Sequence, residues 1–302
     1  MLATPAIGSE TLLPVAAAKQ SVVSVLPVWR GRPPSPEEPE GSGVVVGDGT
    51  EILTADHILG DPVSVRVRTA DGDVVMARVV ARDVASDMAL LAVDVALPPV
   101  MPSVEIYPPV GARVCAIGNA FGLGLSLSCG TVSAVARSGV GFNEIEDFVQ
   151  TDAEVNPGMS GGALVDEEGR LVGLLSAIFT KRSDASIGVN FAVSGPLAAR
   201  ALQRLRAGAA GGWPDPGLAL EPYPPPGETG RSGAHVRNVV PGGQAATAGI
   251  EIGDVIVMAG DRRVRGPADM RAAYVLAAPG SALTMTVLRG DSTVEIPLPA
   301  AP

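Results

Sequence analysis

The most informative stretch of this sequence is Thr151-Asp152-Ala153-Glu154-Val155-Asn156-Pro157-Gly158-Met159-Ser160-Gly161-Gly162-Ala163-Leu164. It holds a serine among glycines, in a turn that runs into an apolar segment. Glycine adopts backbone conformations that other residues avoid, and it lets other atoms approach closely. Such a turn can expose the hydroxyl of Ser160 while the backbone N–H groups around it converge on one point, as the stabilisation of an oxyanion requires. The stretch therefore indicates a nucleophilic serine.

A nucleophilic serine requires a base, and the base requires a carboxylate that orients it. One of the two histidines, His57, comes just after a strand-like run. Asp87 stands at the start of an apolar strand that can bury its carboxylate, and Asp83 and Asp94 compete with it for this role. His57, Asp87 and Ser160 occur in the chain order of one known catalytic triad. Each motif alone is weak evidence, so the prediction depends on all three together.

The three motifs, Leu-Thr-Ala-x-His, Ser-Asp-Met-Ala-Leu-Leu and Gly-x-Ser-Gly-Gly, resemble the catalytic blocks of trypsin-like serine proteases. More narrowly, the chain resembles the HtrA group, which joins such a protease to a PDZ domain. Residues 41–46, 116–122 and 150–153 share the likeness, which covers nearly the whole chain. It implies a mainly β fold, a chymotrypsin-like double β-barrel followed by a small PDZ domain built as a β-sandwich with helices. It also implies a serine endopeptidase that needs no metal and no cofactor, and its spacing favours Asp87 as the third member.

The resemblance also implies which residues surround the nucleophile. The backbone N–H groups of Gly158 and Ser160 would form the oxyanion hole. The pocket for the side chain before the cut would carry no acidic residue, so we expect it to prefer medium aliphatic side chains. Its four expected positions are Val155, Ser176, Ala177 and Ile178.

Met159 departs from the family pattern, because HtrA proteins usually carry asparagine before the nucleophile. A flexible thioether can fill the space, but it cannot replace the hydrogen bonds of an amide, so we expect this loop to be held less firmly. The departure motivates an alternative from another functional class, a catalytically silent binding or chaperone module. A sensor protease that cuts one regulatory protein is a further alternative.

From Gly217 onward the pattern changes, and residues 236–256 resemble a PDZ domain. PDZ domains of this family bind C-terminal peptides by adding a strand to a sheet edge, with the terminal carboxylate held by loop N–H groups. The resemblance places this site in the loop 216–220, where relatives generally carry glycine at position 219, and in a helix over residues 267–276. The residues expected to contact the peptide are Leu218, Ala219, Leu220, Met270 and Tyr274.

Two further expectations come from the resemblance alone. Arg137 matches an arginine in a loop that relays activating signals, although a solvated turn arginine is an equal alternative. Residues 1–20 match an extension that helps to build a homotrimer, but they lack the aromatic residues that such contacts often use.

Short β-rich runs separated by turns predict the two barrels. We divide the chain into an N-terminal extension (1–20), a protease domain (21–208), a linker (209–216) and a PDZ domain (217–300). The proline-rich residues 30–40 predict a loop, and residues 195–208 predict an amphipathic helix that closes the protease domain. The expected strands are 21–28, 43–46, 51–54, 63–68, 74–80 and 88–93 in the first barrel, and 110–117, 125–134, 148–151, 162–165, 171–178 and 186–192 in the second.

The composition restricts the partners. The chain has 302 residues, a formal net charge of −10 and 3% aromatic residues, so aliphatic side chains must form the cores. The negative charge argues against nucleic acid as a partner, and we expect the basic group Arg262, Arg263 and Arg265 to be a solvated hairpin. For Cys115 and Cys129, on neighbouring expected strands, we expect two buried free thiols and keep a disulfide as the alternative.

The sequence leaves the compartment open. No apolar run is long enough to span a membrane. The N-terminal residues lack the pattern of a signal peptide, which taken alone indicates the cytoplasm. HtrA relatives, in contrast, often work in the bacterial envelope or in organelles.

Overall fold

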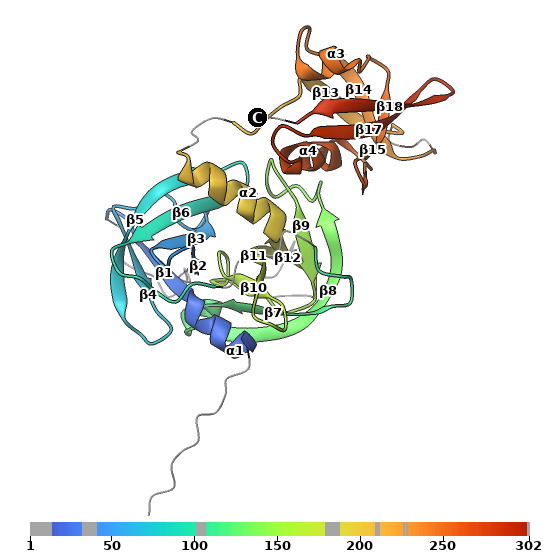
Figure 1. Cartoon of the computed structure of the whole chain (residues 1–302). Helices are drawn as coiled ribbons and strands as arrows, with labels where there is room; N and C mark the ends of the chain where they lie inside the picture. The colour runs from blue at the N-terminus through green and yellow to red at the C-terminus, as the bar shows by residue number, and fades with distance from the viewer. Residues whose placement is uncertain are drawn as a thin grey trace, which may run out of the picture.

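The structure, a computed structural model, describes residues 14–31, 41–100, 107–178, 188–208, 212–225, 227 and 229–300. Two closed six-stranded barrels lie side by side and are followed by a third domain beyond helix α2 (Figure 1). The mainly β architecture predicted from the sequence is confirmed. Much of the N-terminal extension, of the proline-rich loop and of the linker lies outside the described residues, as does the expected start of the last barrel strand.

The first barrel has the strand order β1-β2-β3-β6-β5-β4. Strands β2 and β6 are buried along their whole length, and β6 is apolar throughout, because successive side chains point to opposite faces and both faces are buried. Val23, Val45 and Ile52 pack inside the barrel, while Val22, Val44 and Leu53 face the core shared with the second barrel. The strands are β1 (Val22–Val28), β2 (Gly41–Val46), β3 (Glu51–Ala55), β4 (Ser64–Arg68), β5 (Val74–Asp83) and β6 (Met88–Val93).

The second barrel has the order β10-β11-β12-β9-β8-β7. Helix α2 (Gly195–Arg206) follows it, capped by the Ser194 hydroxyl, which accepts the N–H of Leu197. The buried side of α2 packs on the core between the barrels, as the amphipathic pattern predicted. The remaining elements are α1 (Pro14–Ala18), η1 (Lys19–Ser21), η2 (Ala120–Gly122), β7 (Arg113–Gly118), β8 (Ser126–Arg137), β9 (Phe148–Thr151), β10 (Ala163–Val165), β11 (Leu171–Ile178) and β12 (Asn190–Ser194).

The C-terminal domain is a sheet of order β13-β14-β15-β17-β18, with β16 paired to β15. Its core is formed by the sheet and the two helices, and β13 lies at the sheet edge beside α4. The helix expected over residues 267–276 is present with those bounds. The elements are β13 (Leu218–Tyr223), β14 (Gly233–Val239), α3 (Gln244–Ala248), β15 (Val255–Ala259), β16 (Arg262–Arg263), α4 (Pro267–Leu276), β17 (Ala282–Arg289) and β18 (Ser292–Pro299).

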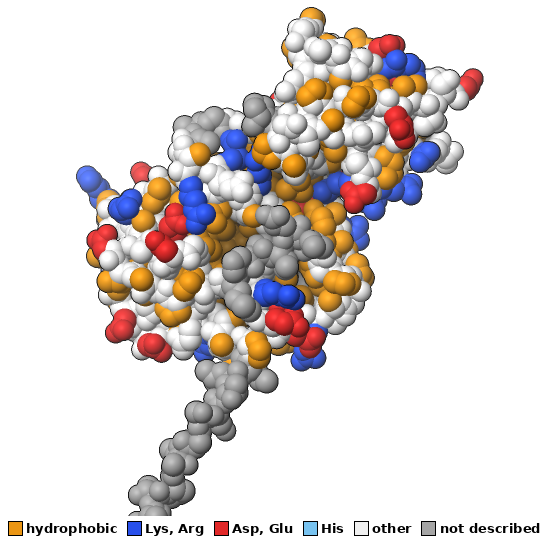
Figure 2. Space-filling view, in the orientation of Figure 1, with side chains coloured by type: hydrophobic (Ala, Val, Ile, Leu, Met, Phe, Trp, Pro, Cys, Tyr) orange, Lys and Arg blue, Asp and Glu red, His pale blue; other side chains and the backbone are white. Residues whose placement is uncertain are grey.

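Charged side chains join the C-terminal domain to the second barrel. Basic and acidic side chains lie together along this boundary in Figure 2. The prediction of a solvated hairpin is wrong for Arg262, whose Nη1 lies 2.7 Å from Oδ1 of the fully buried Asp147. Tyr107 and Ser194 donate their hydroxyls to the other oxygen of this carboxylate. Arg263, its neighbour on β16, is exposed as expected.

Other bonds reinforce the boundary. Ser138 donates to Asp269 of α4 at 2.6 Å, and Arg271 pairs with Glu144 at 3.1 Å. The described part of the linker is also anchored, because the indole N–H of Trp213 donates to Asp83 at 2.7 Å. The linker is therefore a packed segment from Trp213 onward.

The expectation of two free thiols is also wrong, since Cys115 and Cys129 form a disulfide. They face each other directly across β7 and β8. Cys115 is buried, whereas Cys129 is exposed. Pattern alone could not settle the pairing because it depends on the register of two strands. Within the described ranges, no helix is both long and apolar enough to cross a membrane.

Candidate active site

Strand pairing brings His57 and Asp87 together. Strands β3 and β6 are antiparallel with Ala55 opposite Met88, so the chain leaving β3 meets the chain entering β6. The backbone N–H of His57 donates to Asp87 Oδ1 at 2.8 Å, and His57 Nδ1 lies 2.7 Å from Asp87 Oδ2. With Nδ1 engaged in this way, Nε2 is left to act as the base.

Asp87 is set apart from its competitors by these contacts. Asp83 bonds to the Ser86 hydroxyl at 2.7 Å and to the linker tryptophan, and Asp94 is exposed. Burial disfavours the charged imidazole, but the hydrogen bond and charge of Asp87 together with the charge of Asp56 outweigh it, so the pKa of His57 is raised. The imidazole of His57 is therefore protonated up to a higher pH than that of an ordinary histidine.

Ser160 lies on the turn before β10, where the second barrel touches the first. Ser42 of β2 donates its N–H to the Ser160 carbonyl at 2.9 Å, and Gly161 has φ +83°. A Cβ at Gly161 would lie 2.2 Å from the Ser42 carbonyl oxygen, so only glycine fits here. The Ser160 hydroxyl donates to the Ser176 carbonyl at 3.1 Å, and between described residues it makes no hydrogen bond to His57. Catalytic bonds of this kind often tighten only once substrate is bound.

Two peptide groups determine whether the expected oxyanion hole can form. Phe121 donates its N–H to the Pro157 carbonyl at 2.7 Å, and Gly162 donates its N–H to the Met159 carbonyl at 2.9 Å, which orients the peptide group of the Ser160 N–H. The Ser42 hydroxyl holds the peptide between them, because it donates to the Gly158 carbonyl at 2.7 Å. Because C=O and N–H point in opposite directions in a trans peptide, the first bond turns the Gly158 N–H away from Phe121. The N–H groups of Gly158 and Ser160 have no acceptor among the described residues. They are thus available to a developing oxyanion.

Met159 is held more firmly than the sequence suggests. It is 2% exposed, it packs in the apolar core of the second barrel, and its sulfur accepts the N–H of Asn156 at 3.4 Å. The sequence-based expectation of a loosely held loop therefore overlooked a weak hydrogen bond that a thioether can accept. Phe121 and Ser42, which hold the loop through the main chain, were also missed, since their partners lie far away in sequence.

The expected specificity residues fall in different places. Ser176 touches two of the expected triad residues, because its carbonyl accepts from Ser160 and its hydroxyl lies 3.4 Å from Asp87 Oδ2. Val155 is 2% exposed and packs with the barrel core, so its side chain does not wall an open pocket here. The backbones of Ala177 and Ile178 continue β11 beside this site.

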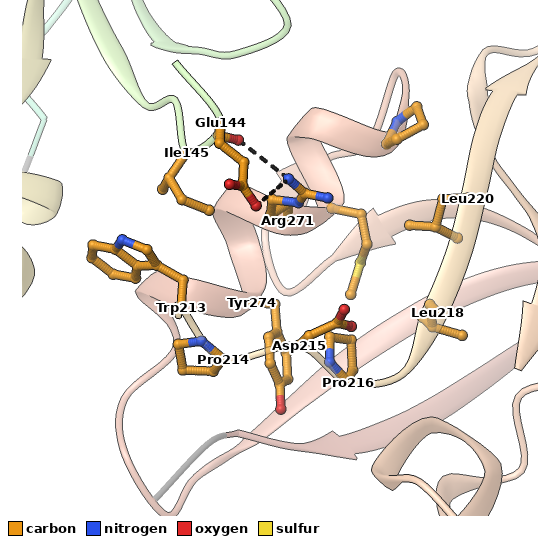
Figure 3. Close-up of a pocket in the computed structure, with 12 residues that line it drawn as sticks. Glu144, Ile145, Trp213, Pro214, Asp215, Pro216, Leu218, Leu220, Arg271 and Tyr274 are labelled. Atoms are coloured by element: carbon orange, nitrogen blue, oxygen red, sulfur yellow. Dashed lines mark hydrogen bonds and ion pairs between the residues drawn. The ribbon is translucent and has the colours of Figure 1, made fainter. Parts of the chain in front are cut away.

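The expected peptide-contacting residues meet in one groove of the C-terminal domain. Leu218 and Leu220 of β13 line one cavity together with Met270 and Tyr274 of α4. Figure 3 shows Leu218, Leu220 and Tyr274 around it. Ala219 does not line it, since alternate residues of a strand point to opposite faces and Ala219 is exposed. Arg137 is exposed at the end of β8 and makes no side-chain bond to another described residue. Its role as a relay stays a prediction, and the bonds described between the two domains are made by other residues, among them Arg262.

This fold and site define the chain as a trypsin-like peptidase joined to a PDZ domain. Residues 41–174 match the family model of the trypsin-like peptidase domain, and residues 185–299 match that of the PDZ domain. The chain is 32% identical to the serine endoprotease DegS of Salmonella typhimurium, with 83% of this chain and 73% of that protein covered. It accordingly belongs to the HtrA-type serine endoprotease family.

Longer relatives and solved structures agree with this assignment. The periplasmic endoproteases DegQ and DegP of Escherichia coli K12 are 30% and 32% identical over 88% and 85% of this chain. The chain spans only 60% and 56% of their lengths. The HtrA-type protease AlgW with a tripeptide has a TM-score of 0.72 at 30% identity, with 95% of both chains covered. The periplasmic names of DegQ and DegP are at odds with the cytoplasmic location indicated by the N-terminal residues alone.

Proposed function

We propose that this chain is a serine endopeptidase acting through His57, Asp87 and Ser160. The Ser160 hydroxyl turns from the Ser176 carbonyl toward His57 Nε2, which takes its proton as the oxygen attacks a peptide carbonyl. The N–H groups of Gly158 and Ser160 stabilise the oxyanion. His57 then protonates the leaving amine, water hydrolyses the acyl-enzyme, and Asp87 holds the imidazole throughout.

The oxyanion hole carries this proposal. Two backbone N–H groups, those of Gly158 and Ser160, lack an acceptor among the described residues, and the chain also holds an exposed histidine against a carboxylate. A domain that only bound other proteins would need neither arrangement. The bond from Phe121 to the Pro157 carbonyl fixes the peptide group that presents the Gly158 N–H, and the bond from the Gly162 N–H to the Met159 carbonyl at 2.9 Å fixes the one that presents the Ser160 N–H. Preorganised donors of this kind supply a large share of catalysis in such enzymes.

The finer assignments rest on the family. We assign residues 21–208 to the protease domain and 217–300 to the PDZ domain, and we expect cleavage of unfolded or tail-displaying proteins after medium aliphatic residues. AlgW was solved with bound peptides, which supports peptide binding by the PDZ groove here, including the C-terminal peptides that the family suggests. The homotrimer and the activating role of Arg137 also rest on resemblance alone.

A silent binding module is the second candidate, because Ser160 bonds to Ser176 rather than to His57. Labelling with a fluorophosphonate, with and without added peptide, separates the two. We expect the parent to be labelled. The control variant Ser292→Ala, which changes an exposed serine on β18, should be labelled as well. Ser160→Ala should not label. A parent that stays unlabelled in both conditions would favour the binding module.

A further inference from the structure

The turn between β5 and β6 presents the carboxylate of Asp87 to His57. Asp87 ends this turn with φ +55°, a left-handed conformation that is uncommon for residues other than glycine and that persists where surrounding contacts hold it. Its N–H donates to the Val84 carbonyl at 3.3 Å. The neighbouring Ser86 is fully buried and donates its hydroxyl to Asp83 Oδ2 at 2.7 Å. Asp83, the last residue of β5, therefore holds the residue next to Asp87.

The linker supports the same carboxylate of Asp83. The indole N–H of Trp213 donates to Asp83 Oδ2 at 2.7 Å, so one oxygen accepts from both Ser86 and Trp213. The indole is itself held by helix α2. The guanidinium carbon of Arg204 lies 4.6 Å from the ring centre, as in a cation–π contact, and Arg204 Nη2 donates to the Gly212 carbonyl at 3.1 Å. Two contacts of Arg204 thus fix the side chain that carries the donor.

A second bond from a distant segment reaches this turn. Ile145 donates its N–H to the Ala85 carbonyl at 2.8 Å, and Ile145 and Trp213 both line the cavity between β13 and α4 (Figure 3). The bond from Ile145 involves main-chain atoms only. Of these two bonds, the one from Trp213 depends on a side chain and can be removed by a substitution.

We propose that Trp213 is a positioning residue for the protease site, because its bond to Asp83 holds the turn that places Asp87 beside His57. The proposal rests on the proposed triad. Asp87 Oδ2 lies 2.7 Å from His57 Nδ1, and a misplacement of about 1 Å in an active site can lower the rate about a hundredfold. The other bonds of the turn remain when the indole N–H is lost, so we expect a smaller effect than this.

The titration of His57 measures the placement of Asp87 without catalysis. Burial lowers the pKa of His57, whereas the hydrogen bond and charge of Asp87 and the charge of Asp56 raise it by more. Asp56 is paired with Arg82, and a change at the linker leaves this pair in place. The full chain has two histidines, so NMR can follow the imidazole signals of each against pH, and His57→Ala assigns them.

We expect the pKa of His57 to be lower in Trp213→Phe and in Asp83→Ala than in the parent, because the expected triad carboxylate is then held less closely. Asp83→Asn should keep the parental titration of His57, since the amide oxygen can still accept both hydrogen bonds. The matched control Asp94→Ala changes an exposed aspartate just after β6 and should also titrate like the parent. The signals of His235 on β14 serve as an internal control and should be the same in every variant.

Fluorophosphonate labelling of Ser160 measures the effect on reactivity. Trp213→Phe and Asp83→Ala should be labelled about three- to tenfold more slowly than the parent, because the carboxylate is displaced but not removed. An unchanged titration of His57 in both variants would overturn the proposal. So would equal shifts in Asp83→Asn and Asp83→Ala, which would make the charge of Asp83 responsible rather than its hydrogen bonds. A parent that is not labelled would count against the proposed function alone, since the NMR titration still tests the role of Trp213.

Discussion

Replacing Arg262 by methionine should loosen the PDZ domain from the protease domain. The side chain of Arg262 is 11% exposed and that of Asp147 0%, and their atoms lie 2.7 Å apart. Arg262 also donates to the Ala136 carbonyl at 3.1 Å. Methionine keeps the length of the side chain but removes the guanidinium, which leaves a buried carboxylate without its cation.

The size of the effect follows from what remains. Removing one partner of a buried ion pair costs about 3–5 kcal/mol. The hydroxyls of Tyr107 and Ser194 stay bonded to Asp147, so we expect the lower end, about 3 kcal/mol, since each such bond contributes about 1 kcal/mol. Amide hydrogens at the boundary exchange when the two domains separate locally. Since about 1.4 kcal/mol corresponds to a factor of ten, a loss of about 3 kcal/mol should make these amides exchange about a hundredfold faster.

Hydrogen exchange of residues 138–148 and 190–194 is the assay, because both segments lie next to Asp147. Arg263→Met is the matched control, since this arginine is the exposed neighbour on the same strand. Asp147→Asn combined with Arg262→Met should cost less than the sum of the two single changes, because the pair acts as a unit. Equal exchange in Arg262→Met and Arg263→Met would refute the reasoning.

Three further outcomes can be measured. The pKa of His57 is raised and the base must be neutral, so kcat/KM should rise with pH through a midpoint above the usual 6.5. Asp87→Asn should lower both this midpoint and the rate. A midpoint below 6.5 in the parent would contradict the prediction. Met159→Asn should change the labelling rate of Ser160 less than about tenfold, well under the 10²–10³ lost with an oxyanion donor, because the hole is held through the main chain. Replacing Cys115 and Cys129 by alanine should lower stability by up to about 3 kcal/mol, since their sequence separation is 14, and an unchanged Tm with and without dithiothreitol would argue against the bond.

The local patterns of this sequence were sufficient for the architecture. Runs that alternate between two buried faces predicted the barrel strands, and the glycine turn at Ser160 predicted where a nucleophile would lie. The order of the three catalytic motifs indicated a triad, and the structure places two of its members in direct contact. These features could be predicted because each depends on residues close together in the chain, where periodicity and turn chemistry act.

Only the tertiary structure decided what depends on distant partners. Arg262 and Asp147 are 115 residues apart, so no local pattern distinguishes this buried pair from a solvated hairpin. The cysteine pairing depended on the register of β7 and β8, and the direction of the Gly158 N–H on a bond from Phe121. The sequence by itself determined which elements form and which residue types can do chemistry. Domain packing and strand register determined which of those residues meet, because burial and partner distance are properties of the folded chain.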